Sequence, residues 1–188
     1  MFGSVGGLFV ATKFPVSHFS HTSFTNNTWQ LNRGFATMEL GVSGHVFARV
    51  IGTHHIHGDA VAARRVQVQQ ILSSVDKKTQ AAAQKSLKNV ATFYCGDLNM
   101  GLKELHTAAG DGVYPPENMG ITCTDKFIQE AWDPKNTKPP ERLDYVLQVK
   151  NGAPQATMTV TQKGLLNKVN SATALSDHDA LVAQIALA

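Results

Sequence analysis

Two short polar segments border apolar runs and hold groups that can bind a metal ion, contact a phosphate or move a proton. Asp97 and Asn99 follow one apolar run, and Asp177 and His178 precede another near the end of the sequence. Such runs predict strands, and strand ends on a rigid sheet are where catalytic groups are usually held. The two segments therefore indicate an active site whose parts are far apart in the sequence.

Three further segments place polar side chains beside predicted strands. His54 follows the apolar run 45–53, Asp133 lies in a Trp-Asp-Pro triplet, and Asp144 lies in Leu-Asp-Tyr-Val. Each signal is weak alone, because an Asp-x-Asn sequence after a strand is more often an ordinary turn. Asp144 is the most unusual, because a carboxylate among core residues is costly unless it is paired. Asp144 therefore needs a partner.

His55 and His57 form a His-x-His pattern on one face of the predicted strand end. Imidazole pairs at such spacing can hold Zn²⁺, but no third ligand is identifiable, so a polar strand end is the favoured interpretation. Arg64 and Arg65 are assigned to the solvent or rim face of the following helix, from which one of them could reach a phosphate.

Length and composition indicate one soluble globular domain, or part of a larger one, over residues 1–188. Of these, 43% are hydrophobic and 16% charged, and no run of 18 apolar residues predicts a membrane span. A net charge of +3 is compatible with an anionic substrate but is too small to indicate nucleic-acid binding. The apolar start lacks a basic segment and a cleavage site, so we expect a strand there rather than a signal peptide. The sequence does not indicate the cellular compartment of the protein.

Alternation of apolar residues predicts strands joined by one long helix and long loops. The expected strands are 7–12, 34–40, 45–53, 90–95, 142–149, 156–162 and 181–187, with helices at 60–75 and 101–109 and loops at 18–32 and 110–140. Segments 34–40 and 45–53 form a hairpin around a Gly-rich turn. This order is typical of an α/β or α+β sheet packed under helices.

The order of the polar segments resembles the endonuclease/exonuclease/phosphatase superfamily, to which deoxyribonuclease I belongs, over essentially the whole chain. Within it, the sequence is most similar to secreted bacterial sphingomyelinases. The segments that carry the resemblance are Val-Ile-Gly-Thr-His ending at His54, Arg65 and Gln69 on the helix, Gly-Asp-Leu-Asn ending at Asn99, the Trp-Asp-Pro triplet at 132–134, and Leu-Asp-Tyr ending at Tyr145. The implied fold is a four-layered β-sandwich with flanking helices, here lacking the N-terminal strands.

The resemblance implies Mg²⁺-assisted (or other divalent-cation) hydrolysis of a phosphoester by in-line attack of water. It assigns His178 as general base, Asp144 as the group that fixes the His178 tautomer, and Asp97 as the residue that orients or deprotonates the water. Asn99 and His54 would donate to the phosphate. Asp177, Asp97 and Asn99 would lie at the metal, which accepts oxygen ligands.

The family's principal metal ligand is a glutamate that has no match in this chain. The five glutamates all lie in other contexts: Glu39, Glu104, Glu117, Glu130 and Glu141. We therefore expect this chain alone to bind Mg²⁺ weakly and to show little or no hydrolase activity.

The expected substrate is a phosphodiester, with a phospholipid head group favoured over nucleic acid and no protein partner identifiable. The alternatives are an endonuclease of the same superfamily and a non-catalytic module that keeps the fold. A nuclease needs several Lys or Arg along its substrate track, whereas the 17 basic residues here are scattered. Residues 147–175 contain no Trp, Phe or Tyr, so we do not expect an aromatic hairpin that inserts into lipid.

Overall fold

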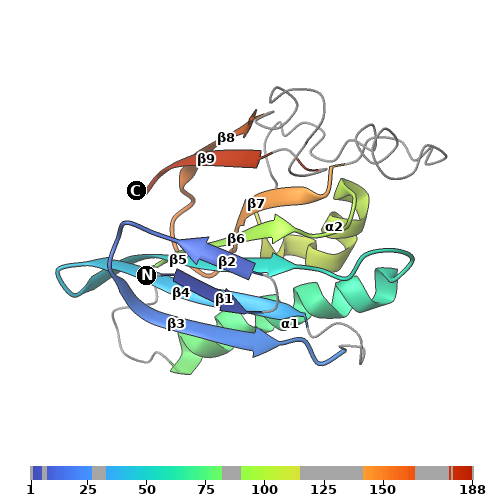
Figure 1. Cartoon of the computed structure of the whole chain (residues 1–188), viewed down its shortest axis with the longest axis horizontal. Helices are drawn as coiled ribbons and strands as arrows, with labels where there is room; N and C mark the ends of the chain where they lie inside the picture. The colour runs from blue at the N-terminus through green and yellow to red at the C-terminus, as the bar shows by residue number, and fades with distance from the viewer. Residues whose placement is uncertain are drawn as a thin grey trace.

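A five-stranded mixed sheet with helices on one face organises the α/β structure of this chain (Figure 1). The computed structural model describes residues 2–5, 8–26, 33–81, 90–114, 142–163, 178 and 180–187. The strand order in the sheet is β3-β4-β5-β6-β7. Its strands are β3 (Val16–Ser23), β4 (Gly34–Val42), β5 (His45–His54), β6 (Ala91–Asp97) and β7 (Asp144–Gln148).

The β4–β5 hairpin and the crossover to β6 set the register of the sheet. Ser43 and Gly44, both at positive φ, close the hairpin in the left-handed conformation that such tight turns need. The chain then returns through α1 (Val61–Ala81), so that β6 pairs with β5 in parallel, while β7 is antiparallel to β6. The strands predicted at 34–40, 45–53, 90–95 and 142–149 and the helix predicted at 60–75 are therefore confirmed as β4, β5, β6, β7 and α1.

The prediction of a loop over 18–32 is wrong for its first part, because β3 runs from Val16 to Ser23 and pairs with β4. β3 is an edge strand whose side chains are exposed or half-buried, so its Ser, His and Thr residues carry no apolar alternation. Residues 27–32 lie outside the described part, as do residues 115–141 of the predicted loop 110–140.

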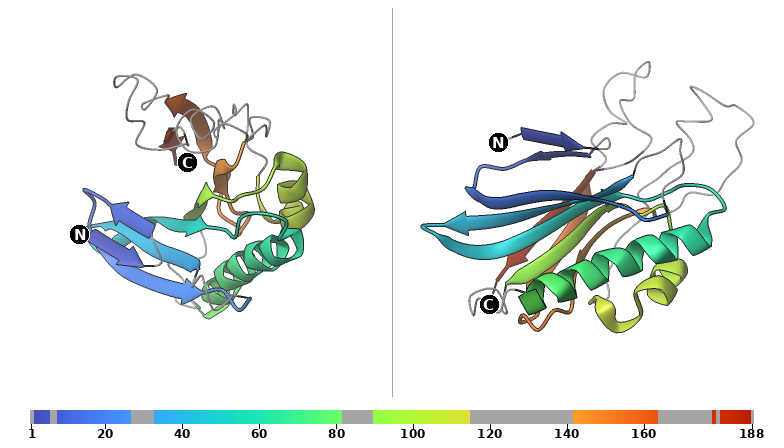
Figure 2. Two further views of the ribbon diagram at one scale, coloured as in Figure 1. Left: turned by 45° about the vertical axis from the view of Figure 1, so that its right-hand side comes forward. Right: turned by 90° about the horizontal axis from the view of Figure 1, so that it is seen from below.

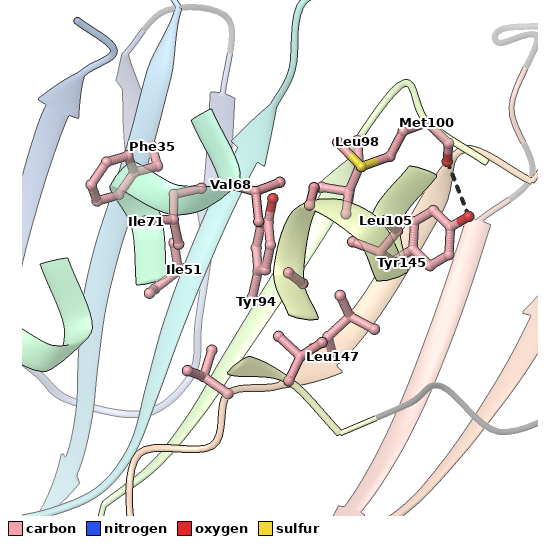
Figure 3. Packing of buried hydrophobic residues seen from close by; sticks show 14 of the residues in the cluster. Phe35, Ile51, Val68, Ile71, Tyr94, Leu98, Met100, Leu105, Tyr145 and Leu147 are labelled. Carbon is pink, nitrogen blue, oxygen red and sulfur yellow. Dashed lines mark hydrogen bonds between the residues drawn. The ribbon is translucent and has the colours of Figure 1, made fainter. Parts of the chain in front are cut away.

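The main core lies between the sheet and the helices α1 and α2 (Leu102–Ala109), shown in Figure 3. Ile71 and Val68 of α1 meet Ile51 of β5 and Tyr94 of β6 there. The Tyr145 hydroxyl donates to the carbonyl of Met100 (3.0 Å), which ties β7 to the segment before α2. Neither helix is long and apolar enough to cross a membrane.

Two hairpins lie on the opposite face of the sheet (Figure 2). They are β1 (Phe2–Val5) with β2 (Leu8–Ala11), and β8 (Thr157–Lys163) with β9 (Ala180–Ala186). A small second core joins the β8–β9 hairpin to the sheet through Ala48, Phe93, Ala156 and the half-buried Met158. In the described residues the order is therefore helices, sheet and hairpins, as in one helix-covered half of a β-sandwich with part of the second half.

Candidate active site

Three of the residues selected from the sequence form one row across adjacent strands. His54 at the end of β5 pairs in register with Asp97 at the end of β6, and Asp97 pairs with Asp144 at the start of β7. Paired residues on neighbouring strands point to the same side of a sheet. Side chains alternate between the two faces along a strand, and Tyr94 and Tyr145, which point to the other face from Asp97 and Asp144, are buried in the core under the helices. The row therefore points to the hairpin face.

His178 joins this row from the distant end of the chain. Its Nδ1 lies 2.6 Å from Oδ2 of Asp144, and its Nε2 lies 3.9 Å from Oδ2 of Asp97. Asp144 thus has the partner that its position among core residues requires. A carboxylate at Nδ1 holds the proton of a neutral imidazole on that nitrogen and leaves Nε2 as the basic atom. Asp177 lies outside the described residues.

The turn after β6 fixes Asp97 with its own neighbours. The backbone N–H of Asn99 donates to Oδ1 of Asp97 (2.8 Å), and its side-chain Nδ2 donates to Oδ2 of Asp97 (3.1 Å) and to the carbonyl of His55 (3.0 Å). Asn99 adopts a φ of 50°, which asparagine tolerates better than most residues. The Asp-x-Asn segment is thus both an ordinary turn and part of the candidate site.

Gly96 is required where β6 passes β5. Its φ is 137°, and a Cβ there would collide with the carbonyl oxygen of Thr53. This close approach of two backbones is open only to glycine. It brings Asp97 into register with His54.

His55 and His57 do not form a metal pair, and both lie beyond the end of β5. His55 is fully buried, where its Nε2 lies 2.8 Å from the Tyr94 hydroxyl and its ring meets Phe24 edge-on. His57 is exposed and lines the cavity described below. The pattern on one strand face predicted from sequence is therefore wrong, because the chain leaves the sheet after His54.

Arg64 corrects another prediction, because it is buried rather than on the rim of α1. Its Nε and Nη2 donate to the two carboxylate oxygens of Glu104 on α2 at 2.7 and 3.0 Å. Its Nη1 donates to the carbonyl of Gly58 (2.6 Å) and more weakly to that of Ile56 (3.3 Å). Arg64 therefore clamps the segment that carries the site histidines. Arg65 is exposed, as predicted.

Arg33 is a site residue that sequence reasoning missed. It precedes β4, and its Nη1 donates to the carbonyl of His55 while its Nη2 lies 3.4 Å from Nδ1 of His57. An arginine directly before the first glycine of a predicted strand was the available signal. The polar residues that precede it predict a loop, which hides this signal.

These groups surround an open cavity of about 510 Å³, within the size range of small-ligand sites. Its lining residues are Leu8, Arg33, Thr53, His54, His57, Asp97, Asn99, Asp144 and His178. All five residues assigned a catalytic role from sequence lie here. Leu8 shows that the β1–β2 hairpin forms one wall.

Burial shifts the pKa values of two cavity residues in opposite directions. It raises the pKa of Asp97 to about 6, helped by the Asp144 carboxylate and opposed by the Asn99 N–H, His178 and Arg33. Burial also lowers the pKa of His54 to about 4, together with the charges of Arg33, His178 and His57. At neutral pH, therefore, Asp97 is largely ionised and His54 is a neutral imidazole.

A metal ion could be held by Asp97, Asp144 and His178, whose ligand atoms lie within 4.8 Å of one another. The two carboxylates are the ligand type that Mg²⁺ prefers, so the site fits a divalent ion in chemistry. The described glutamates are engaged elsewhere: Glu39 pairs with Arg49 (3.1 Å) and Glu104 with Arg64. Glu117, Glu130 and Glu141 lie outside the described residues.

Solved structures with the same fold give this arrangement a context. Sphingomyelinase C from Streptomyces griseocarneus is 24% identical, with a TM-score of 0.71 over 95% of this chain and 67% of that chain. A beta toxin mutant from Staphylococcus aureus with bound magnesium ions is 20% identical, with a TM-score of 0.74 over 95% and 67%. Truncated TDP2 from Caenorhabditis elegans is 21% identical, with a TM-score of 0.67 over 96% and 69%.

This chain is shorter than the chains it matches, and it spans 59% of SmcL, to which it is 26% identical over 84% of its own length. No family model and no curated protein matches the sequence. The similarity is therefore one of fold, to structures of sphingomyelinases and TDP2.

Proposed function

We propose that this chain, which has the deoxyribonuclease I-like fold, contributes the catalytic groups of a phosphodiester hydrolase. The observation that carries the proposal is the 2.6 Å contact between His178 and Asp144 beside the ionisable Asp97. A histidine oriented by a carboxylate, next to a second carboxylate in an open cavity, is an arrangement suited to activating water.

In the proposed reaction, His178 and Asp97 act on one water molecule. Oδ2 of Asp97 and Nε2 of His178 are 3.9 Å apart, so a water oxygen can contact both atoms at ordinary hydrogen-bond lengths. His178 takes the proton as the water oxygen bonds to phosphorus and the bond from phosphorus to the leaving oxygen breaks. The leaving oxygen takes up a proton from solvent, to which the cavity is open. Asp144 stabilises the imidazolium that forms.

His54 and Asn99 complete the proposed site. The neutral His54 ring can donate one N–H to a non-bridging oxygen, where charge builds up in the transition state. Asn99 fixes Asp97, and donation from its Nδ2 to the phosphate requires exchange of one of its two present bonds. A divalent ion held by Asp97, Asn99 and Asp177, the residues that the resemblance implies, would neutralise charge on the phosphoryl oxygens.

A phospholipid head group is the favoured substrate, because the lining of the cavity is poor in basic residues. Arg33 is the only Lys or Arg among the described lining residues. A nuclease that follows a polyanionic strand uses several such contacts. The similarity to TDP2 keeps an endonuclease or other nucleic-acid phosphodiesterase as the alternative, and the third possibility is a non-catalytic module.

The test is hydrolysis of sphingomyelin and of plasmid DNA, side by side, with Mg²⁺ and with chelator, at a protein concentration high enough to detect the low activity expected of this chain alone. His178→Ala is the diagnostic variant, and His106→Ala, at an exposed histidine on α2, is the matched control. Metal-dependent release of the head group that is lost only in His178→Ala supports the proposal. Metal-dependent nicking of DNA would instead support the alternative, and equal effects of the two variants would refute the assignment of His178.

A further inference from the structure

We propose that Arg33 is the anion-binding residue of this cavity and holds the phosphodiester monoanion even without a metal ion, an inference that rests on the proposed function. Two carboxylates, Asp97 and Asp144, line the cavity and repel a phosphate. Among the described lining residues, Arg33 is the side chain that stays positively charged at all working pH values. The cavity needs such a charge to accept an anionic substrate.

The backbone around Arg33 is fixed on both sides, which makes its position well defined. The Phe24 N–H donates to the carbonyl of Arg33 (3.0 Å), and the Thr53 hydroxyl donates to the carbonyl of Gly34 (2.9 Å). A Cβ on Gly34 would collide with the Thr22 carbonyl and with the ring of His21. The chain therefore enters β4 along one path, and a pre-positioned charge loses less free energy on binding than a mobile one.

The guanidinium of Arg33 lies at the histidine side of the row. It bonds the carbonyl of His55, the same oxygen that receives the side chain of Asn99, and it approaches Nδ1 of His57. Arg33 lines the same cavity as His54 and Asp97. Arg33 is thus tied to the backbone that links β5 to α1 while its charge reaches the centre of the cavity.

The planar fork of a guanidinium matches two oxygens of a phosphate, and bonds of this kind are about twice as strong as neutral ones. A phosphodiester has two non-bridging oxygens that share one negative charge. With Arg33 holding one of them, the other faces the rest of the cavity lining, which includes His54. The site would thereby select an anionic diester over a neutral ester of the same size.

The experiment measures binding without turnover. Dimethyl phosphate is titrated into the full chain in excess EDTA, and the imidazole NMR signals of the cavity histidines report on occupancy. Trimethyl phosphate, which is uncharged, is the matched ligand control. Arg33→Gln is compared with Arg33→Lys and with Arg65→Gln, which removes an exposed arginine of α1 outside this cavity. Circular dichroism and thermal unfolding check the fold of each variant.

We expect wild type and Arg65→Gln to bind dimethyl phosphate but not trimethyl phosphate. Arg33→Gln should bind about tenfold or more weakly, as for loss of a charged hydrogen bond, and Arg33→Lys should keep part of the affinity. If Arg33→Gln unfolds, the folded Arg33→Lys variant and a fall in wild-type affinity with added salt decide the matter. Equal binding by wild type and Arg33→Lys, with no salt dependence, would overturn the proposal.

Failure of this inference and failure of the proposed function give different results. Anion binding that depends on Arg33, together with no turnover of any diester, would refute the hydrolase and leave the anion site. Metal-dependent turnover of a diester, together with binding of dimethyl phosphate in EDTA that is unchanged in Arg33→Gln, would support the hydrolase and refute the anion site. Absence of dimethyl phosphate binding by wild type in EDTA would also refute the anion site.

Discussion

Asp97 and Asp144 lie directly opposite each other on β6 and β7, and both line the same cavity. Like charges at directly opposed positions of a sheet destabilise it. Hydrogen bonds from Asn99 to Asp97 and the contact of His178 with Asp144 offset that repulsion. A pair of carboxylates maintained in this way points to chemistry rather than to stability.

The Asp144–His178 contact gives the first prediction. Asp144→Asn keeps the shape of the side chain but removes the charge that stabilises a His178 imidazolium, so the rate of hydrolysis should fall about 100-fold or more. Initial rates on the preferred diester measure the effect. Asp111→Asn, at an exposed carboxylate beyond α2, should leave the rate unchanged. A rate in Asp144→Asn within twofold of wild type would exclude the proposed role.

Gly96 gives a prediction about stability. In Gly96→Ala, the added methyl group meets the Thr53 carbonyl at a φ of 137°, so the free energy of unfolding should fall by about 3 kcal/mol or more. Urea unfolding provides the measurement. Gly101→Ala is the control, because a Cβ there meets nothing within 4 Å and φ is −71°. Comparable losses in the two variants would argue against the close approach of β5 and β6.

The buried His55 predicts a dependence of stability on pH. Burial, followed by the charges of His54, Arg64 and Arg33, lowers its pKa from 6.5 to about 3. The unfolded chain therefore binds a proton that the folded chain excludes, so stability is full above pH 6.5 and is lost as pH falls toward 3. The loss attributable to His55 should approach about 1.4 kcal/mol per pH unit.

Denaturant unfolding at several pH values tests this effect. In His55→Gln, the dependence over this range should be weaker than in wild type, although the variant starts from a lower stability. His106→Gln, at an exposed site, should retain the wild-type dependence. An unchanged slope in His55→Gln would mean that other groups cause the acid sensitivity.

The Arg64 clamp predicts a difference between neighbouring arginines. Arg64→Ala removes both bonds to Glu104 and one of the two bonds that the Gly58 carbonyl accepts, the other coming from the Ala60 N–H, so the free energy of unfolding should fall by about 3 kcal/mol. Arg65→Ala should change it by less than about 0.5 kcal/mol, because Arg65 is exposed. Thermal unfolding of the two variants provides the comparison. Equal stability of the two would contradict the buried position of Arg64.

The strands whose side chains alternate between the core and the opposite face could be predicted from the sequence, and so could the polar residues at their ends. His54, Asp97 and Asp144 could be selected because each interrupts or ends an apolar run. β3 could not be predicted, because an edge strand with half-exposed side chains lacks that contrast. The buried position of Arg64 also could not be predicted, because it depends on Glu104, 40 residues away and on another helix.

Arg33 shows the same limit at the site itself. Its contribution depends on its distance from the His55 carbonyl and from His57, and these contacts arise only when β4 pairs with β5. The local sequence around Arg33 does not reveal how far its side chain lies from these two residues in the folded chain.

The row of His54, Asp97 and Asp144 also makes the candidate site a reporter of folding. Its members come from three strands separated by α1, α2 and longer connections, so no short fragment of the chain contains a local version of it. Contacts between residues so distant in sequence form slowly, because loop-closure entropy must be overcome first. In refolding experiments, anion binding should therefore recover with the complete sheet, later than the helical signal of α1.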